Sequence, residues 1–245
     1  MGREARLREL GLWPVWRLRA APAAAEGTAA PAPEGDAAEA EPAPAPLIRR
    51  GDASIARMDW DELKRAVASC TRCALHEGRT QAVFGTGDRH ARWLVIGEAP
   101  GEKEDLQGEP FVGPSGMLLD AMLAAVGLKR GEGVYIANVV KSRPPSNRDP
   151  VPSEVAACLP YLERQIELIR PRIILALGRF AAQSLLMTDT PIGRLRGHVH
   201  EYHGVPMVVT YHPAYLLRNP PDKAKVWEDL LLARRTLAAQ PQPEA

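Results

Sequence analysis

The chain has 245 residues and a formal net charge of +1 at pH 7, so its overall charge does not require a nucleic-acid partner, and any DNA contact must come from a local patch. No apolar run approaches the roughly 18 residues of a membrane span, and the N-terminus lacks the apolar core of a signal peptide. We therefore expect a cytoplasmic protein without membrane association, whose three cysteines stay reduced.

The N-terminal fifth of the chain differs in composition from the rest. Residues 1–20 contain two tryptophans and several leucines, and an Ala-, Pro- and Glu-rich stretch follows. Such a stretch cannot bury enough apolar surface to offset its ordering entropy, so we expect residues 21–57 to form a disordered linker. Residues 1–20 then resemble a tethered docking peptide; the alternatives are that they pack on the folded domain or do nothing.

Residues 58–237 are expected to form the folded domain, followed by a tail at 238–245. A helix is predicted from Trp60 to about Ala68, and apolar runs predict buried strands at 93–96, 134–140, 172–178 and 205–211. Further helices are expected from about 116, capped by Ser115, and over 152–169, 178–186 and 222–237. This alternation predicts an α/β fold with a mostly parallel sheet covered on both faces.

Distinctive polar residues stand where three of the predicted strands end. Glu98, Asn138 and His212 would meet at one rim of a parallel sheet, the edge where open α/β sheets bind ligands. With Phe111 close by, they predict a pocket for a flat, hydrogen-bonding ligand, since an Asn amide can read a ring edge with a donor and an acceptor at once.

Each of these residues also has a simpler interpretation. Glu98 could cap the following helix, Asn138 could satisfy a neighbouring loop, His212 could be a turn residue before Pro213, and Phe111 could belong to the core. Their joint placement favours the pocket.

Two loops are candidates for DNA contact. The proline-rich loop at 141–150 supplies three cations that could neutralise phosphates: Lys141, Arg143 and Arg148. The segment after His212 places Leu216 and Leu217 beside Arg218, which suits an apolar wedge that enters a base stack. The alternatives are a solvated loop and two leucines that pack inward.

Five motifs together resemble the family 4 uracil-DNA glycosylases, the iron–sulfur branch of the uracil-DNA glycosylase superfamily. They are Gly97-Glu-Ala-Pro-Gly101, Pro110-Phe-Val-Gly113, Asn138-Val-Val-Lys141, Arg143-Pro-Pro145 with Asn147-Arg-Asp-Pro150, and His212-Pro-Ala-Tyr-Leu-Leu217. The resemblance covers roughly residues 60–237. It implies a three-layer α/β/α fold and a base-excision repair enzyme that flips uracil out of DNA and hydrolyses its N-glycosidic bond, leaving an abasic site.

The resemblance also implies a role for each pocket residue. Glu98 looks like the acidic residue that orients or activates water, and His212 like the donor to the departing uracil. Phe111 looks like the stacking residue, Asn138 like the ring-edge reader, and Ala99 like a further uracil contact. These residue types suit a reaction in which a sugar cation develops near a carboxylate and the base leaves as an anion near hydrogen-bond donors.

The same resemblance implies a [4Fe–4S] cluster held by four cysteines. Cys70-Thr-Arg-Cys73 has metal-ligand spacing, and Cys158 is the third cysteine of the chain. Ser142 stands at the expected fourth position, and serine is a poor replacement for a thiolate. Three outcomes stay open: a cluster with an oxygen or water ligand at the odd iron, a labile three-iron form, or no cluster. Without a cluster, the three cysteines would be buried free thiols.

The sequence also allows other classes of function. The runner-up is a non-catalytic DNA-binding or clamp-loader-associated protein that keeps the glycosylase fold. A small-molecule nucleotide hydrolase would need a phosphate loop, and Gly85-Thr-Gly87 is too short for one. The Lys-Arg-Arg-Ile-His loop of cross-linking relatives is absent, so we expect turnover and release of DNA.

The segment from Leu10 to Arg19 is similar to the start of the psi subunit of bacterial DNA polymerase III, which docks on the clamp loader. This similarity implies a bacterial, nucleoid-associated protein that contacts the clamp loader through residues 1–20. We expect a monomer, although no residue pattern bears on the oligomeric state.

Overall fold

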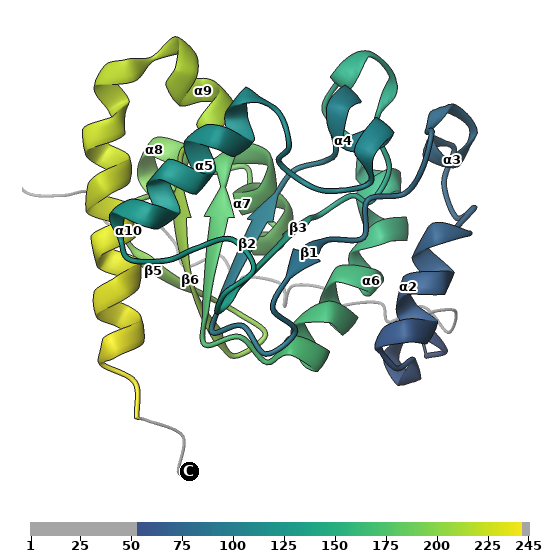
Figure 1. The fold of residues 1–245 in the computed structure, drawn as a ribbon, viewed down its shortest axis with the longest axis horizontal. Coiled ribbons are helices and arrows are strands. Elements are labelled where there is room, and N and C mark those ends of the chain that lie inside the picture. Colours follow the sequence, from purple (N-terminus) through teal and green to yellow (C-terminus); the bar gives the residue numbers. More distant parts are fainter. Residues whose placement is uncertain (1–52, 242–245) are drawn as a thin grey trace, which may run out of the picture. The chain divides into compact units, whose positions relative to one another are not determined.

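The apolar runs of the sequence form the centre of a six-stranded sheet in the computed structural model, which describes residues 53–241 (Figure 1). Four strands are parallel neighbours: β3 (Val134–Asn138), β2 (Trp93–Gly97), β4 (Ile173–Leu177) and β6 (Val205–Thr210). Short antiparallel strands complete the two edges: β1 (Thr86–Gly87) and β5 (Val199–Tyr202). The mostly parallel α/β fold expected from the sequence is confirmed.

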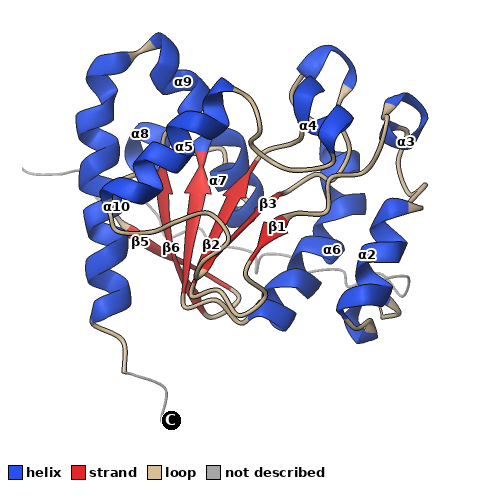
Figure 2. Ribbon diagram, viewed as in Figure 1, coloured by secondary structure: helices blue, strands red, loops and turns tan. Residues whose placement is uncertain are grey.

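Helices cover both faces of this sheet (Figure 2). One face packs against α2 (Trp60–Ala68), α6 (Pro152–Ile169) and α7 (Gly178–Leu186). The other packs against α5 (Pro114–Ala125), α9 (Pro213–Arg218) and α10 (Lys223–Ala238). Successive residues of a strand point to opposite faces, so Leu94 of β2 belongs to the first core and Val95 to the second, both with no exposed surface. The sheet is therefore buried on both sides, which explains its uninterrupted apolar runs.

The remaining elements are short. They are the helices α3 (Leu75–Gly78), α4 (Glu102–Gln107) and α8 (Ile192–Leu195), and the 3₁₀ turns η1 (Ile55–Arg57), η2 (Pro145–Asn147) and η3 (Pro220–Asp222).

Three local expectations need correction. Ser115 does not cap the helix: α5 begins at Pro114, its N-cap is Gly113, and no side chain caps it. The segment after His212, expected to be a loop, contains helix α9. Ile55 packs in the core three residues before the expected start of the domain at Met58.

The expected docking peptide at 1–20, most of the linker and residues 242–245 lie outside the described residues. Within residues 53–241, no helix is both long enough and apolar enough to cross a membrane.

Candidate active site

Four polar or aromatic residues meet above the carboxyl ends of β2, β3 and β6. Glu98 follows β2 directly, Asn138 is the last residue of β3, and His212 follows β6 by two residues. Together with Phe111 from the loop between α4 and α5, they line one pocket of about 490 Å³. The structure thus brings together the four residues that the sequence placed at one rim.

Asn138 carries an unusual atom for a buried side chain. The residue is 2% exposed, yet its Oδ1 has no hydrogen-bond partner. Gly97 makes room for it, because a Cβ at Gly97 would lie 2.4 Å from that oxygen and 2.6 Å from the Phe111 ring. Buried acceptors are rarely left unpaired, so Asn138 Oδ1 is suited to accept a hydrogen bond from a ligand and is not satisfied by a neighbouring loop.

Phe111 sits in a backbone conformation that few side chains adopt. Its φ is +56°, in the left-handed region. The guanidinium of Arg130 donates to the carbonyl oxygens of Pro110 (3.0 Å) and Phe111 (2.9 Å), and Glu104 Oε1 accepts from the backbone N–H groups of Val112 (3.0 Å) and Gly113 (3.3 Å). The loop is therefore held from both sides, and the Phe111 ring faces the pocket.

His212 is the N-cap of α9, and its Nδ1 accepts a 3.1 Å hydrogen bond from the N–H of Ala214. Nδ1 therefore carries no proton, and in the neutral ring the proton is on Nε2. Burial and, to a smaller extent, nearby Arg218 lower the pKa of His212 to about 4, against an opposing effect of Glu104. At neutral pH the imidazole is thus a neutral donor. His212 therefore both caps a helix in the turn before Pro213 and lines the pocket.

Glu98 has a carboxyl group that is poised between its two protonation states near neutral pH. Burial and, to a smaller extent, the charge of Asp149 raise its pKa to about 7, against an opposing effect of Arg179. Asp149 and Arg179 form an ion pair of 2.6 Å at the pocket rim. Glu98 does not cap α4, whose N-cap is Gly101. A carboxyl with a strongly shifted pKa in a cleft is typical of a catalytic acid or base.

Sequence reasoning missed several residues that complete the site. Glu104, Asp149 and Tyr215 line the pocket, and Arg130 supports it from outside. Asp149 lay within a quoted motif, but its proximity to Glu98 depends on how the loop folds back. Arg130 offered no sequence signal, because it supports the Phe111 loop through backbone carbonyls, which carry no side-chain pattern. Ala99, expected as a uracil contact, also lines the pocket.

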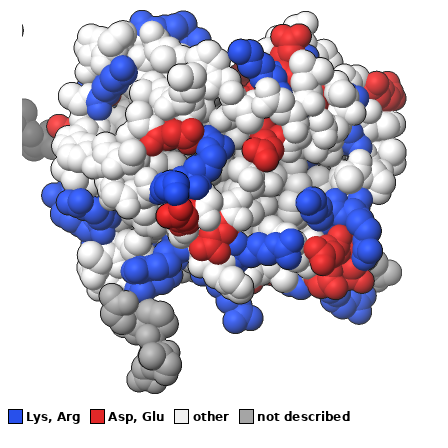
Figure 3. Space-filling model, in the orientation of Figure 1, with Lys and Arg blue, Asp and Glu red and all other residues white. Residues whose placement is uncertain are grey.

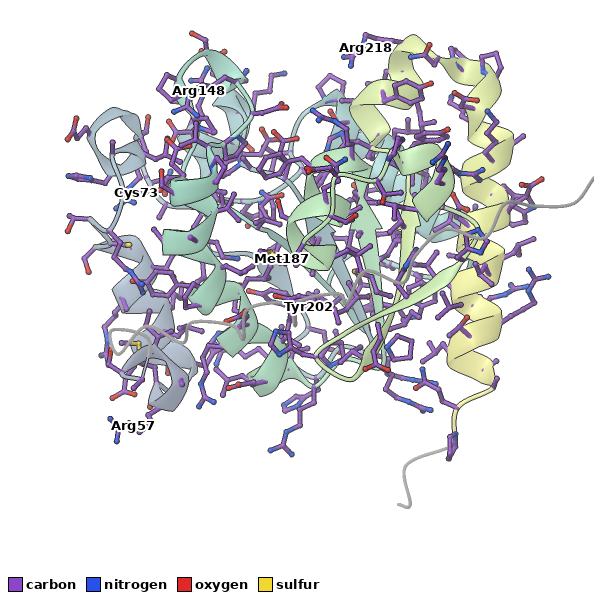
Figure 4. The ribbon with its side chains drawn as sticks, turned by 180° about the vertical axis from the view of Figure 1, so that it is seen from behind. Arg57, Cys73, Arg148, Met187, Tyr202 and Arg218 are labelled. Atoms are coloured by element: carbon purple, nitrogen blue, oxygen red, sulfur yellow. The ribbon has the colours of Figure 1, made fainter. Side chains whose placement is uncertain are left out.

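Four of the six residues expected to contact DNA are exposed or partly exposed. Arg148 and Arg218 are exposed and line the pocket, and both lie along the upper edge in Figure 4. Arg148 is also fixed by hydrogen bonds of 2.9 and 2.7 Å to Glu154. Arg143 is partly buried and donates to Asn147 Oδ1 at 2.8 Å, while Leu217 is 47% exposed.

The other two expectations are corrected. Lys141 is 2% exposed and its ammonium is hydrogen-bonded inside the protein, so it cannot reach a phosphate. Leu216 is fully buried in the core beneath α9 and cannot act as a wedge. On the face drawn in Figure 3, the described Lys and Arg side chains are interspersed with Asp and Glu and form no continuous basic band.

The three cysteines are free thiols, and each sulfur has a hydrogen-bond donor. Tyr161 O–H donates to Cys70 Sγ at 3.4 Å, and Lys141 N–H donates to Cys158 Sγ at 3.1 Å. A backbone hydrogen bond from Leu75 lowers the pKa of Cys73 against the larger, opposite effect of burial. Burial raises the pKa of Cys158 to about 11, and Cys70 and Cys73 add to this rise, so the three groups are close enough to interact. N–H and O–H donors aimed at sulfur suit thiolate ligands.

The fourth position does not match a cysteine site. Ser142 is 5% exposed, and its Oγ accepts a 2.8 Å hydrogen bond from Arg79, whose other Nη donates to the Ala68 carbonyl at 3.0 Å. Among residues 53–241, no three His, Cys, Asp or Glu side chains are grouped so that they could hold a metal ion. The described residues thus offer three cysteine thiols, and Ser142 stands where a fourth was expected.

Comparison with known proteins identifies the family. Residues 84–231 match the model of the Uracil DNA glycosylase superfamily. The chain is 49% identical over 168 residues to the Type-4 uracil-DNA glycosylase of Archaeoglobus fulgidus, across 65% of this chain and 84% of that protein. The chain belongs to the type-4 uracil-DNA glycosylases.

Further relatives agree with this family. The Type-4 uracil-DNA glycosylase of Saccharolobus solfataricus is 44% identical over 190 residues, across 74% of this chain and 88% of that protein. The Type-5 uracil-DNA glycosylase of Thermus thermophilus is 37% identical over only 118 residues, across 42% of this chain and 53% of that protein. The type-4 resemblance stated from the motifs is confirmed, and the fold around the pocket is that of a uracil-DNA glycosylase.

Proposed function

We propose that the protein is a uracil-DNA glycosylase of base-excision repair, which hydrolyses the N-glycosidic bond of uracil in DNA and leaves an abasic site. The observation that carries this function is the unpaired Oδ1 of Asn138 at the bottom of a pocket beside the Phe111 ring. Uracil presents a ring N–H between two carbonyls, so the Asn138 amide accepts from the N–H and donates to a carbonyl. Cytosine has a lone pair where uracil has the N–H, and two acceptors would face each other.

The geometry supports a sequence of events at this site. The target nucleotide leaves the base stack and its base enters the pocket, at a cost of a few kcal/mol. The Phe111 ring offers a stacking surface, and base–aromatic stacking is worth about 1–3 kcal/mol. Arg148 and Arg218 at the rim can then neutralise phosphates beside the flipped nucleotide.

Bond cleavage needs opposite charges on the two sides of the C1′–N1 bond. As the bond breaks, the sugar becomes cationic and the base becomes an anion. Neutral His212 donates from Nε2 to a carbonyl oxygen of the base, where the negative charge develops. Ionised Glu98 stabilises the sugar cation and accepts a proton from the attacking water, as carboxylates do in glycosidases. DNA is then released without a covalent adduct.

We also propose that the cysteines hold an iron–sulfur cluster with three protein thiolates. The donors aimed at Cys70, Cys73 and Cys158 support this, and the Arg79–Ser142 hydrogen bond argues against a fourth protein ligand. When bound, the cluster would link the Cys70–Cys73 segment to α6 and so contribute to stability.

Contact with the DNA polymerase III clamp loader through residues 1–20, and with it a nucleoid location, is a further proposal that rests on the sequence similarity of that segment alone. Recovery of clamp loader in a pull-down with the full chain, but not with a chain lacking residues 1–20, would support it. Equal recovery would refute it.

Base selectivity tests the proposed function. The protein is incubated with two single-stranded oligonucleotides that differ at one position, uracil against cytosine, and the free base is measured. We expect release of uracil and none of cytosine. Release of neither base by folded protein would favour the non-catalytic DNA-binding alternative, which the present findings do not favour.

A further inference from the structure

Lys141 is a buried cation that the mechanism above does not use. It lies three residues beyond the end of β3 and is 2% exposed. Its ammonium donates to the Asn138 carbonyl oxygen at 2.9 Å and to Gln165 Oε1 at 2.6 Å. Both acceptors are neutral, and none of the ion pairs within residues 53–241 involves Lys141. Cys158 is the titratable group that acts on this cation. A buried charge is costly even when it is hydrogen-bonded, so the position calls for a specific role.

The two acceptors hold the ammonium in one place. Gln165 has no exposed surface, and its Nε2 donates to the Phe84 carbonyl at 2.9 Å, so its amide has a fixed orientation. The carbonyl of Asn138 belongs to the last residue of β3, paired in register with Gly97 of β2. Lys141 therefore anchors the end of the strand that carries the unpaired Oδ1.

The backbone of Lys141 is fixed as well. Its N–H donates to Cys158 Sγ at 3.1 Å, and its carbonyl accepts from the N–H of Val83 at 2.7 Å. One residue thus bonds to a cysteine through its main chain and to the base-reading residue through its side chain. The intervening Val139 and Val140 donate to the carbonyls of Gly97 and Glu98, at 2.9 and 3.0 Å, so the same segment also borders the catalytic carboxylate.

We propose that Lys141 is a positioning residue: its buried ammonium fixes the Asn138 main chain so that Oδ1 stays aimed at the base, and its N–H couples that strand end to the cysteine site. Asn138 Oδ1 has no protein partner of its own, so its direction depends on the backbone that carries it. This inference rests on the proposed function, because it concerns the residue that reads uracil.

Replacement of Lys141 by methionine tests the proposal, because methionine keeps the length of the side chain and removes the donor. Single-turnover excision of uracil should slow by about ten- to a hundredfold, as expected for a misplaced binding group. The Kd for uracil-containing DNA should change by less than about twofold, because Lys141 does not reach the surface. Circular dichroism and the thermal midpoint verify folding, and Lys64→Met on the exposed face of α2 is the matched control.

A double-mutant cycle separates positioning through Asn138 from a general structural effect. In an Asn138→Ala background, Lys141→Met should slow single-turnover excision by less than about twofold, because the effects of two coupled residues are not additive. An equal loss in both backgrounds would overturn the proposal, as would an unchanged rate in the single variant. A weakened Kd with a smaller salt dependence would instead indicate a phosphate contact and also overturn it.

If Lys141→Met does not fold, Lys141→Gln, which keeps a polar group at the site, is analysed by the same cycle with the same criteria. Wild-type protein is assayed in parallel. An inactive wild type would refute the proposed function together with this inference, whereas an active wild type with an unaffected Lys141 variant would refute the positioning role alone.

Discussion

The rings of Phe111 and His212 lie with their centroids 5.5 Å apart and their planes inclined by 30°. The stacking surface and the neutral donor are thus neighbours on one wall of the pocket, while Asn138 Oδ1 lies close to the Phe111 ring near Gly97. A base stacked on Phe111 would therefore lie in the same pocket as the His212 imidazole, which we propose as the donor to the departing base.

Loss of the Phe111 ring should impair base capture. Phe111→Ala removes the stacking surface, worth about 1–3 kcal/mol, so excision should slow by about ten- to a hundredfold. Phe111→Tyr, which keeps an aromatic ring, should remain within a few-fold of wild type. Single-turnover rates of the two variants make the comparison, and equal rates would show that Phe111 is a core residue.

The strained loop that carries Phe111 depends on Gly116. A Cβ at Gly116 would lie 1.8 Å from the Phe111 carbonyl oxygen, so Gly116→Ala must move that loop. We expect a loss of activity of about tenfold or more. Gly193→Ala is the control, because a Cβ there meets no atom within 4 Å and the backbone is not in the left-handed region. Similar activity of both variants would contradict the account of the loop.

The rate of excision should rise with pH through the range in which Glu98 ionises. The pKa of Glu98 is about 7, and that of His212 is about 4, so His212 stays neutral while Glu98 becomes charged. Single-turnover rates from about pH 5 to 9 should therefore rise and then level off, without an acidic limb from His212. A flat profile at low pH would show that a carboxylate at position 98 is not needed.

The raised pKa of Glu98 should also make the stability of the protein depend on pH. The pKa of Glu98 is higher in the folded state than its ordinary value of 4.5, so the folded protein binds more protons between about pH 4.5 and 7, and stability falls across that range. Glu98→Gln removes the ionisation. The variant should be more stable than wild type at pH 8, by on the order of 1–2 kcal/mol after allowance for partial exposure, and equal to it near pH 4. Urea unfolding at the two pH values measures the difference.

Ser142 should limit retention of the cluster. Ser142→Cys supplies the fourth thiolate, so protein purified without oxygen should keep more iron and sulfide per chain, and keep it longer in air. Ser153→Cys, on the exposed first turn of α6, is the control for an added thiol. Wild-type protein that is free of iron and still active would show that the cluster is not required for activity.

The features predicted from the sequence are those that depend on long, uninterrupted patterns. The four parallel strands are buried on both faces, so their apolar runs were unmistakable, and their ends located Glu98, Asn138 and His212. The missed strands, Thr86–Gly87 and Val199–Tyr202, are short edge strands with partly exposed residues, which leave little pattern.

The errors came from side chains whose environment is set by tertiary contacts. Lys141 stands in a basic, proline-rich segment that predicts exposure, yet its ammonium is buried against the Asn138 carbonyl and against Gln165, which lies 24 residues further along the chain. Leu216 and Leu217 are adjacent, but in helix α9 one faces the core and the other faces outward. Arg130 supports Phe111 from 19 residues away, which no local pattern can reveal.

The most direct test of the account is the release of uracil from an oligonucleotide with a single uracil, by wild-type protein and by Glu98→Gln, under single-turnover conditions at pH 8. The account predicts rapid release by wild type and a loss of about a hundredfold or more in the variant. Equal release by both proteins would contradict the assignment of Glu98, and no release by folded wild type would contradict the proposed function.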